Sequence, residues 1–334
     1  MMEIRSLGRT GLKVTNLCLG TMTFGNQADK NISFKILDKA FDAGVNFIDT
    51  ADVYPIGRAS YEIAGATESI IGGWLEGKRD KVVLATKCFG VMGPGANDKG
   101  LSRKHIITAV EDSLRRLRTD YKDLYQAHQF DPSTPVDETL RAFDHLIEQG
   151  KVRYIGVSNW RAWQVAKANG IADRKNYARI VSVQPRYNLL FRMIEDDLVP
   201  MALDEGLGII SYNPLAAGLL TGRYSKNASI EEGTRFGLGN NAGILYQERY
   251  WQEANFDAVK KYQYWCEEHN YDPTTTAVRW VTHQPGITSA ITGASHPEQL
   301  EASLRAADRG ELTQQELEWL DGLWFSLPRR REFS

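Results

Sequence analysis

The sequence has few cysteines and no long apolar run. Its three cysteines are Cys18, Cys88 and Cys266; none forms a CxxC pair, and the odd number argues against a disulfide framework. No stretch approaches the ~18 consecutive apolar residues that a membrane-spanning helix needs. The first segment, Met1 to Val14, lacks the apolar core of a signal peptide. We therefore expect a cytoplasmic protein with no membrane partner.

An excess of charge of either sign is also absent. The 334 residues include 40 Lys and Arg and 42 Asp and Glu, which gives a net charge of -2 at pH 7. Nucleic-acid binding depends on many clustered basic residues that release counterions. The one basic cluster that stands out, Arg329 to Arg331, is short, and we interpret it as a solvated tail. We predict no nucleic-acid partner.

Motifs that define several common enzyme classes are missing. No GxGxxG occurs, so a Rossmann-type cofactor site is not expected, and no GxSxG nucleophile turn is present. No HExxH or clustered His/Cys pattern occurs, so we predict no metal site. The segment Gly72 to Arg79 approaches a P-loop, but Arg79 stands where Ser or Thr must bind Mg²⁺. We reject nucleotide binding of that kind.

Short apolar segments alternate along the chain with longer segments of helical periodicity. Apolar-dense strands are typical of a sheet that is covered on both faces. Eight strands are predicted, at Asn16 to Gly20, Asn46 to Thr50, Lys81 to Lys87, Asp123 to His128, Tyr154 to Ser158, Ile180 to Gln184, Gly208 to Tyr212 and Gly286 to Thr292. The alternation predicts an α/β fold, a closed (β/α)8 TIM barrel, as one domain over residues 1–334. An open doubly wound sheet is the alternative.

Two additions to the barrel are expected. Glu3 to Val14 reads as an N-terminal β-hairpin, and an extra C-terminal helix follows Thr313. Long loops follow the C-terminal ends of strands, where TIM barrels carry their active sites. These loops are predicted at Phe89 to Gly100, Pro185 to Glu195 and Leu219 to Tyr246.

Four ionisable residues come at or just after the ends of three consecutive strands: Asp49, Tyr54, Lys87 and His128. Each has an ordinary alternative: an aspartate often forms a turn, a tyrosine lies at a rim, and a histidine is structural. Lysine, however, is rarely buried unless it is paired. Because consecutive strand ends meet at one barrel mouth, the four together predict an active site.

Several motifs in chain order resemble those of the aldo-keto reductases, and most closely the bacterial members related to potassium-channel β subunits. The similarity extends from about Ile4 to the last barrel helix. The motifs are Asn46 to Tyr54 (NFIDTADVY), Gly156 to Asn159, Gln184 to Asn188, Tyr212 to Leu215, Gly218 to Tyr224 and Gly293 to Leu300.

The resemblance implies a catalytic role for each of the four residues. Tyr54 would be the general acid that protonates a carbonyl oxygen, and His128 would orient that carbonyl. An ordinary tyrosine has a pKa of about 10, and we expect Lys87 to lower the pKa of Tyr54. Asp49 would hold Lys87 by an ion pair.

The resemblance also implies NADPH as the cofactor. Ser158, Asn159 and Gln184 would bind the nicotinamide carboxamide, and Tyr212 would stack on the ring. Arg223 would contact the pyrophosphate or ribose, and Gly293, Ser295 and Gln299 the adenosine phosphate. Gly293 and Gln299 also have ordinary interpretations, as a turn and as a solvated helix residue. The other expected cofactor contacts are Thr21, Met22, Asn213, Pro214 and Leu215.

Two departures from the family pattern leave NADH open. Ala302 and Ser303 stand where the family usually has Glu and Asn, and few basic residues lie near this loop. Arg235, on the long loop, could contact the phosphate instead. Phe24 and Trp160 are predicted to bind substrate, with core packing as the alternative for Trp160.

The predicted function is the reduction of aldehydes or ketones with NADPH, the small carbonyl substrate being the partner. A cofactor-binding regulatory subunit with little turnover is the first alternative. A Schiff-base aldolase that uses Lys87 is the second, although Asp49 should keep that lysine charged. Assembly into a homo-oligomer is left open.

Overall fold

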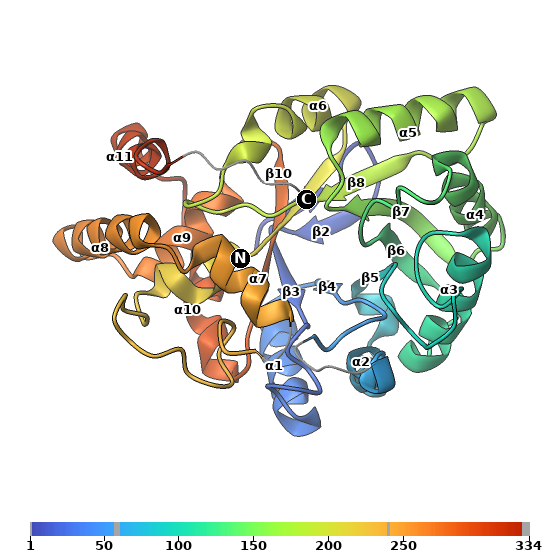
Figure 1. Ribbon diagram of the computed structural model, residues 1–334, viewed down its shortest axis with the longest axis horizontal. Coiled ribbons are helices and arrows are strands. Elements are labelled where there is room, and N and C mark those ends of the chain that lie inside the picture. The colour runs from blue at the N-terminus through green and yellow to red at the C-terminus, as the bar shows by residue number, and fades with distance from the viewer. Residues whose placement is uncertain (1, 57–60, 239–240, 329–334) are drawn as a thin grey trace.

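The computed structural model describes residues 2–56, 61–238 and 241–328, and the predicted basic tail, Arg329 to Arg331, lies outside them. Within this part of the chain, eight parallel strands close a barrel in the order β10-β3-β4-β5-β6-β7-β8-β9. Helices surround the barrel (Figure 1). The predicted α/β barrel is confirmed, and the open-sheet alternative is wrong.

Each predicted strand begins and ends within two residues of an observed one. The strands of the barrel are β3 (Leu17–Gly20), β4 (Phe47–Asp49), β5 (Val83–Cys88), β6 (Lys122–Ala127), β7 (Val152–Ser158), β8 (Ile180–Gln184), β9 (Gly208–Tyr212) and β10 (Ile287–Gly293). The helices are α1 (Lys30–Asp42), α2 (Ala66–Trp74), α3 (Arg103–Leu117), α4 (Val136–Glu148), α5 (Ala162–Lys175), α6 (Leu198–Glu205), α7 (Asn241–Tyr250), α8 (Glu253–Glu268), α9 (Pro273–Thr282), α10 (Leu300–Ala307) and α11 (Gln314–Phe325).

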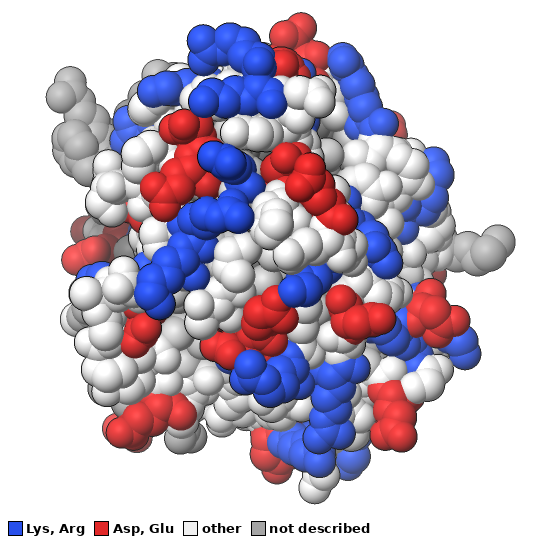
Figure 2. Space-filling model, turned by 90° about the vertical axis from the view of Figure 1, so that its right-hand side faces the viewer, with Lys and Arg blue, Asp and Glu red and all other residues white. Residues whose placement is uncertain are grey.

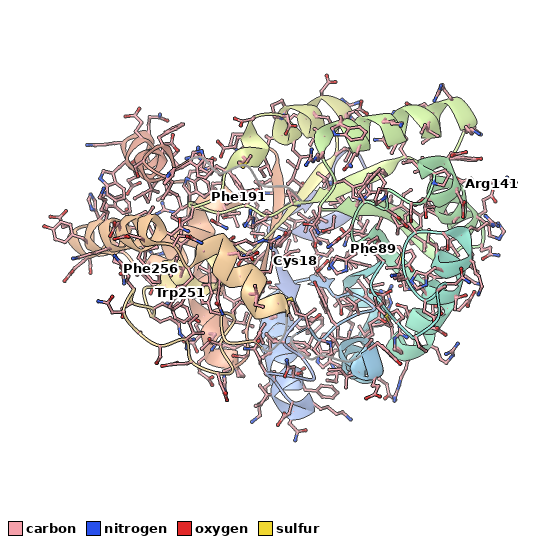
Figure 3. All side chains as sticks on the ribbon, viewed as in Figure 1. Cys18, Phe89, Arg141, Phe191, Trp251 and Phe256 are labelled. Carbon is pink, nitrogen blue, oxygen red and sulfur yellow. The ribbon has the colours of Figure 1, made fainter. Side chains whose placement is uncertain are left out.

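The predicted N-terminal hairpin is present as β1 (Ile4–Ser6) and β2 (Lys13–Thr15), which pair antiparallel. Its turn packs against the chain that enters β9: the Arg9 amide donates to the Gly206 carbonyl at 2.9 Å. Gly8 has φ +58°, and a Cβ there would lie 2.6 Å from that carbonyl oxygen. Leu7 and Val14 of the hairpin join the apolar core inside the barrel, in which Cys18 also lies (Figure 3). The hairpin therefore closes the end of the barrel opposite the strand C-termini.

The helices bury one face each against the barrel. α3 begins after Ser102, whose side chain accepts a hydrogen bond from the His105 amide at 3.2 Å, as expected of an N-cap. The predicted C-terminal helix is α11, which buries Leu320 and Leu323 and lies beside α8 (Figure 1). On the face that Figure 2 shows, Lys and Arg side chains alternate with Asp and Glu.

The long loop predicted at Leu219 to Tyr246 is partly wrong. The segment from residue 222 to 238 is irregular, but α7 begins at Asn241 and continues to Tyr250. The other two predicted loops contain no helix or strand apart from a short 3-10 turn at Met193–Glu195. All three follow strand C-termini, and together they surround one mouth of the barrel.

Candidate active site

A cavity of about 2060 Å³ opens at the C-terminal ends of the barrel strands. The structure brings most of the predicted site residues together around it. The predicted residues that line it are Thr21, Met22, Asp49, Tyr54, His128, Ser158, Asn159, Gln184, Tyr212, Asn213, Pro214, Leu215, Arg223, Gly293, Ser295 and Gln299. The predicted residues that do not line it are Lys87, Phe24 and Trp160.

Lys87 lies directly beneath the cavity, at the end of β5, with its side chain fully buried. Its Nζ donates to Asp49 Oδ2 at 2.5 Å and to the Thr50 carbonyl oxygen at 2.8 Å. The same Nζ lies 5.1 Å from the centroid of the Tyr54 ring. A buried lysine that is paired in this way is a charged group held close to the phenol.

Asp49 is held by amide groups as well as by Lys87. Its Oδ1 accepts hydrogen bonds from Gln184 Nε2 at 2.8 Å and from Gln126 Nε2 at 3.2 Å. Gln184 was predicted from the sequence as a cofactor contact, and Gln126, on β6, was not predicted at all. With both oxygens occupied, this buried carboxylate keeps a fixed position under the cavity.

Tyr54 sits on a tight turn that follows β4. Its amide donates to the Ala51 carbonyl at 3.2 Å, and its carbonyl accepts from the Gly65 amide at 3.1 Å. The rings of Tyr54 and His128 meet edge to face, with centroids 5.8 Å apart. The phenol and the imidazole therefore lie side by side at the same end of the cavity.

Burial is the largest influence on the pKa values of Tyr54, His128 and Lys87. Burial raises the pKa of Tyr54 to about 12, although Lys87 acts to lower it. Lys87 acts in the expected direction, but burial has the larger effect, so the net pKa lies above its ordinary value. Burial and the nearby Lys87 lower the pKa of His128 to about 3, so its imidazole is neutral. Burial acts to lower the pKa of Lys87, but Asp49 and Tyr54 outweigh it and the pKa is raised.

A chain of polar side chains extends from His128 across the cavity. Asn159 Nδ2 donates to the His128 carbonyl oxygen at 3.0 Å, and the Tyr212 hydroxyl donates to Asn159 Oδ1 at 2.8 Å. Ser158 Oγ donates to the Gln184 carbonyl at 3.0 Å. Asn159 has φ +59°, a left-handed conformation that asparagine tolerates better than most residues. This arrangement places amide and phenol groups next to Tyr54.

The irregular segment 222–238 forms one wall of the cavity. Aromatic rings attach this segment to the chain that follows it. The ring centroids of Phe236 and Trp251 lie 4.9 Å apart, and those of Trp251 and Phe256 lie 5.0 Å apart (Figure 3). Two arginines of this wall, Arg223 and Arg235, line the cavity. Arg235 Nη1 lies 3.4 Å from Met22 Sδ, so this wall reaches across to the loop after β3.

The far end of the cavity lies at the turn between β10 and α10. Ser295 donates to Gln299 Oε1 from its amide at 2.9 Å and from its hydroxyl at 3.2 Å. Ala302 lines the cavity, whereas Ser303 is 2% exposed and does not. Only the first of the two departures from the family pattern therefore faces the cavity.

Phe24 and Trp160, which were predicted to bind substrate, point away from the cavity. Phe24 is fully buried in the core between the barrel and α1, and Trp160 is 5% exposed. Trp160 packs edge to face on Phe130 at 5.0 Å. Phe130 and Trp163 line the cavity in their place. Of the two tryptophans, Trp163 and not the predicted Trp160 therefore faces the cavity.

α7 contributes residues that the sequence analysis missed because it read this segment as a loop. Leu245, Tyr246 and Arg249 line the cavity from this helix. Tyr246 and Arg235 lie close together, with the guanidinium 5.4 Å from the ring centroid. Among the described residues, no group of His, Cys, Asp or Glu side chains could hold a metal ion. No helix in the described part of the chain is long and apolar enough to cross a membrane.

The closed barrel therefore carries a buried Asp–Lys pair beneath a tyrosine and a histidine at the C-terminal ends of its strands. A model of the aldo/keto reductase family matches residues 16–324, and the chain belongs to this family. It is 40% identical over 314 residues to "Uncharacterized oxidoreductase YrpG" of Bacillus subtilis, covering 92% of this chain and 91% of that protein.

Two further relatives are similar over nearly their whole length. The "Probable voltage-gated potassium channel subunit beta" of Arabidopsis thaliana is 38% identical over 309 residues, with 92% of each chain covered. "Protein tas" of Escherichia coli is 35% identical over 331 residues, which covers 91% of this chain and 93% of that one. Family membership and the oxidoreductase relative support oxidoreductase activity.

Proposed function

We propose that the protein reduces aldehydes and ketones to alcohols with NADPH, with Tyr54 as the general acid. The observation that carries this proposal is the buried ion pair of Lys87 and Asp49, which holds a positive charge 5.1 Å from the Tyr54 ring. The His128 ring meets the same tyrosine edge to face, with centroids 5.8 Å apart.

The lining of the cavity fits a dinucleotide together with a carbonyl compound. The volume of the cavity exceeds the roughly 300–1,000 Å³ of an ordinary small-molecule pocket. Ser158, Asn159 and Gln184 would hold the nicotinamide carboxamide, with Tyr212 against the ring. Bound there, NADPH would supply the hydride that the carbonyl carbon accepts.

The remaining cofactor contacts lie further along the cavity. Arg223 and Arg235 would contact phosphates, and Ser295 and Gln299 the adenosine end. Among the described residues, no carboxylate pairs with Arg235, so its guanidinium can bind an anion. Placed against the 2′-phosphate, this guanidinium would favour NADPH over NADH.

The protein's own groups would position and protonate the substrate. The Tyr54 hydroxyl and the neutral His128 imidazole donate hydrogen bonds to the carbonyl oxygen. As hydride reaches the carbon, the proton passes from the Tyr54 hydroxyl to that oxygen, which gives the alcohol. The tyrosinate that remains is stabilised by the Lys87 ammonium, and Asp49 keeps that lysine in place.

A regulatory subunit that binds cofactor with little turnover is supported by the name of the Arabidopsis relative. A Schiff-base aldolase is disfavoured, because Lys87 is fully buried, bonded to Asp49 and has a raised pKa, so it is not a free amine. The cytoplasmic location, the single domain and assembly with other copies stay predictions.

The test is a fluorescence titration of the protein with NADPH and NADH, followed by absorbance of the dihydronicotinamide when aldehydes are added. We expect tighter binding of NADPH and a loss of absorbance that depends on aldehyde. Tight binding without turnover would favour the regulatory subunit. Failure to bind either cofactor would contradict the proposal.

A further inference from the structure

A cluster of buried polar side chains lies behind the Tyr54 turn, outside the lining of the cavity. We call it the buried cluster; its members are Asp52, Glu68, Cys88, Arg116, Lys122 and Tyr125. Asp52 is 1% exposed, and Glu68 and Lys122 are fully buried. Nothing in the proposed reaction uses these ionisable groups.

Glu68, on α2, is the acid of the buried cluster whose two carboxyl oxygens are both hydrogen-bonded. Its Oε2 accepts from Arg116 Nε at 2.8 Å, and its Oε1 accepts from Thr86 Oγ1 at 2.6 Å and Ser113 Oγ at 2.5 Å. Thr86 immediately precedes Lys87, so this carboxylate also fixes the end of β5. The only arginine of the buried cluster is therefore already engaged.

Asp52 is the other acid, and it lacks such partners. Neither of its carboxyl oxygens makes a hydrogen bond of normal geometry. Lys122 does not pair with it: its Nζ donates to the Val110 carbonyl at 3.0 Å and lies 4.6 Å from the Tyr125 ring centroid. A buried carboxylate without a partner is costly, so the neutral acid is favoured here. Burial and then Glu68 raise the pKa of Asp52 to about 8, against the opposing effect of Arg116.

The backbone of Asp52 connects the two central residues of the site. The Asp52 amide donates to the Lys87 carbonyl oxygen at 3.1 Å. Asp52 is also the second residue of the turn that the Tyr54 amide closes on the Ala51 carbonyl. Asp52 is 1% exposed, so bringing its side chain into contact with water would require a shift of the surrounding chain, of which this turn and the tyrosine on it are part.

We propose that the neutral carboxyl of Asp52 positions Tyr54, and that loss of its proton moves the Ala51–Tyr54 turn and slows proton transfer. The alkaline limit of the enzyme is then set outside the cavity, by a residue that touches neither substrate nor cofactor. This proposal rests on the proposed function of Tyr54.

The groups that face Asp52 decide the pH at which it ionises. Glu68 faces it from α2, Arg116 from α3, Cys88 from β5, and Lys122 and Tyr125 from β6. Burial lowers the pKa of Lys122 to about 8 as well, so Asp52 and Lys122 change charge over the same pH range. Variants that remove either Asp52 or Lys122 alone distinguish the effect of one ionisation from that of the other.

The first experiment is the pH profile of kcat for the wild type, Asp52→Asn, Asp52→Ala and Lys122→Met at saturating cofactor. We expect wild-type kcat to fall severalfold between about pH 7 and 9.5, since one ionisation is enough for that decline. Asp52→Asn, which keeps the shape of the neutral acid, should match the wild type at neutral pH and lose this decline. Lys122→Met should move the decline to higher pH, because a cation that favours the carboxylate is gone.

Asp52→Ala, which leaves a cavity behind the turn, should lower kcat at every pH. At neutral pH, Asp52→Asn should therefore have the higher kcat of the two variants. An unchanged decline in Asp52→Asn, or a kcat at neutral pH as low as that of Asp52→Ala, would overturn the proposal.

A second readout does not depend on activity. The hydrogen-exchange protection of the amides from Asp52 to Tyr54 should drop above about pH 8 in the wild type and not in Asp52→Asn, because only the wild type gains a buried charge there. Constant protection in the wild type would also overturn the proposal. Loss of protection in a protein that reduces no carbonyl would support the switch in the turn and reject the proposed function.

Discussion

Lys87 Nζ and Asp49 Oδ2 lie 2.5 Å apart directly beneath the cavity, and both side chains are buried. Removing either partner alone would leave an isolated buried charge. Lys87→Met should therefore lower the free energy of unfolding by about 3–5 kcal/mol. The double variant Asp49→Asn, Lys87→Met should recover much of that stability, because no charge remains unpaired.

The same variants separate stability from chemistry. Neither the single nor the double variant should regain carbonyl reduction, because the charge beside Tyr54 is lost in both. Denaturant unfolding and kcat measured on the same preparations check this. A double variant no more stable than Lys87→Met would contradict the pairing argument.

Lys122 predicts a stability gain that depends on pH. Its pKa is lowered from 10.5 to about 8 by burial, so the folded state disfavours its charged form by about 3 kcal/mol. This cost is fully present below pH 8 and disappears as the pH rises from there toward 10.5. Lys122→Met should therefore be more stable than the wild type at neutral pH, with a gain that shrinks above about pH 8. Thermal unfolding over this range is the measurement, and a Lys122→Met variant less stable than the wild type at neutral pH would contradict it.

The two tryptophans near the cavity should behave differently. Trp160 is 5% exposed and Trp163 is 56% exposed at the cavity wall. Trp160→Ala should cost about 3–5 kcal/mol of stability, whereas Trp163→Ala should cost little. Trp163→Ala should instead raise KM severalfold for bulky aromatic aldehydes, because it loses apolar contact with the substrate. An equal effect on small and bulky aldehydes would argue against this wall as the substrate site.

Arg235 should discriminate between the two cofactors. We expect Arg235→Ala to weaken NADPH binding by about 10- to 150-fold, in line with the ~1.5–3 kcal/mol of a hydrogen bond to a charged group. NADH binding should change less if the guanidinium contacts the 2′-phosphate. Fluorescence titration measures both, with Arg9→Ala, far from the cavity, as a matched control. Equal losses for the two cofactors would place Arg235 on a phosphate that both share.

Much of the fold could be predicted because the strands are apolar on both faces and alternate with amphipathic helices. The ends of β4, β5 and β6 then placed Asp49, Lys87 and His128 at one mouth without any structure. α7 could not be predicted, because its apolar residues Ile244 and Leu245 are not packed in the core and the segment has no clear apolar stripe.

The finer features of the site depend on packing that spacing along the chain does not define. Which tryptophan faces the cavity depends on the turn before α5. The pKa of Tyr54 depends on how burial balances the charge of Lys87, and a list of neighbours cannot give that balance. Asp52 lies inside the motif that carries Tyr54, yet only the structure shows that its side chain points away from the cavity without partners.

The central claim is that Tyr54 donates the proton, and Tyr54→Phe tests it most directly. NADPH oxidation that depends on an aldehyde should be followed by absorbance in the wild type and in Tyr54→Phe, with NADPH affinity measured on the same samples. The account predicts a fall in kcat of about 10²–10⁴-fold with nearly unchanged affinity, because the variant lacks only the acidic hydroxyl. Near-normal turnover in Tyr54→Phe would contradict it.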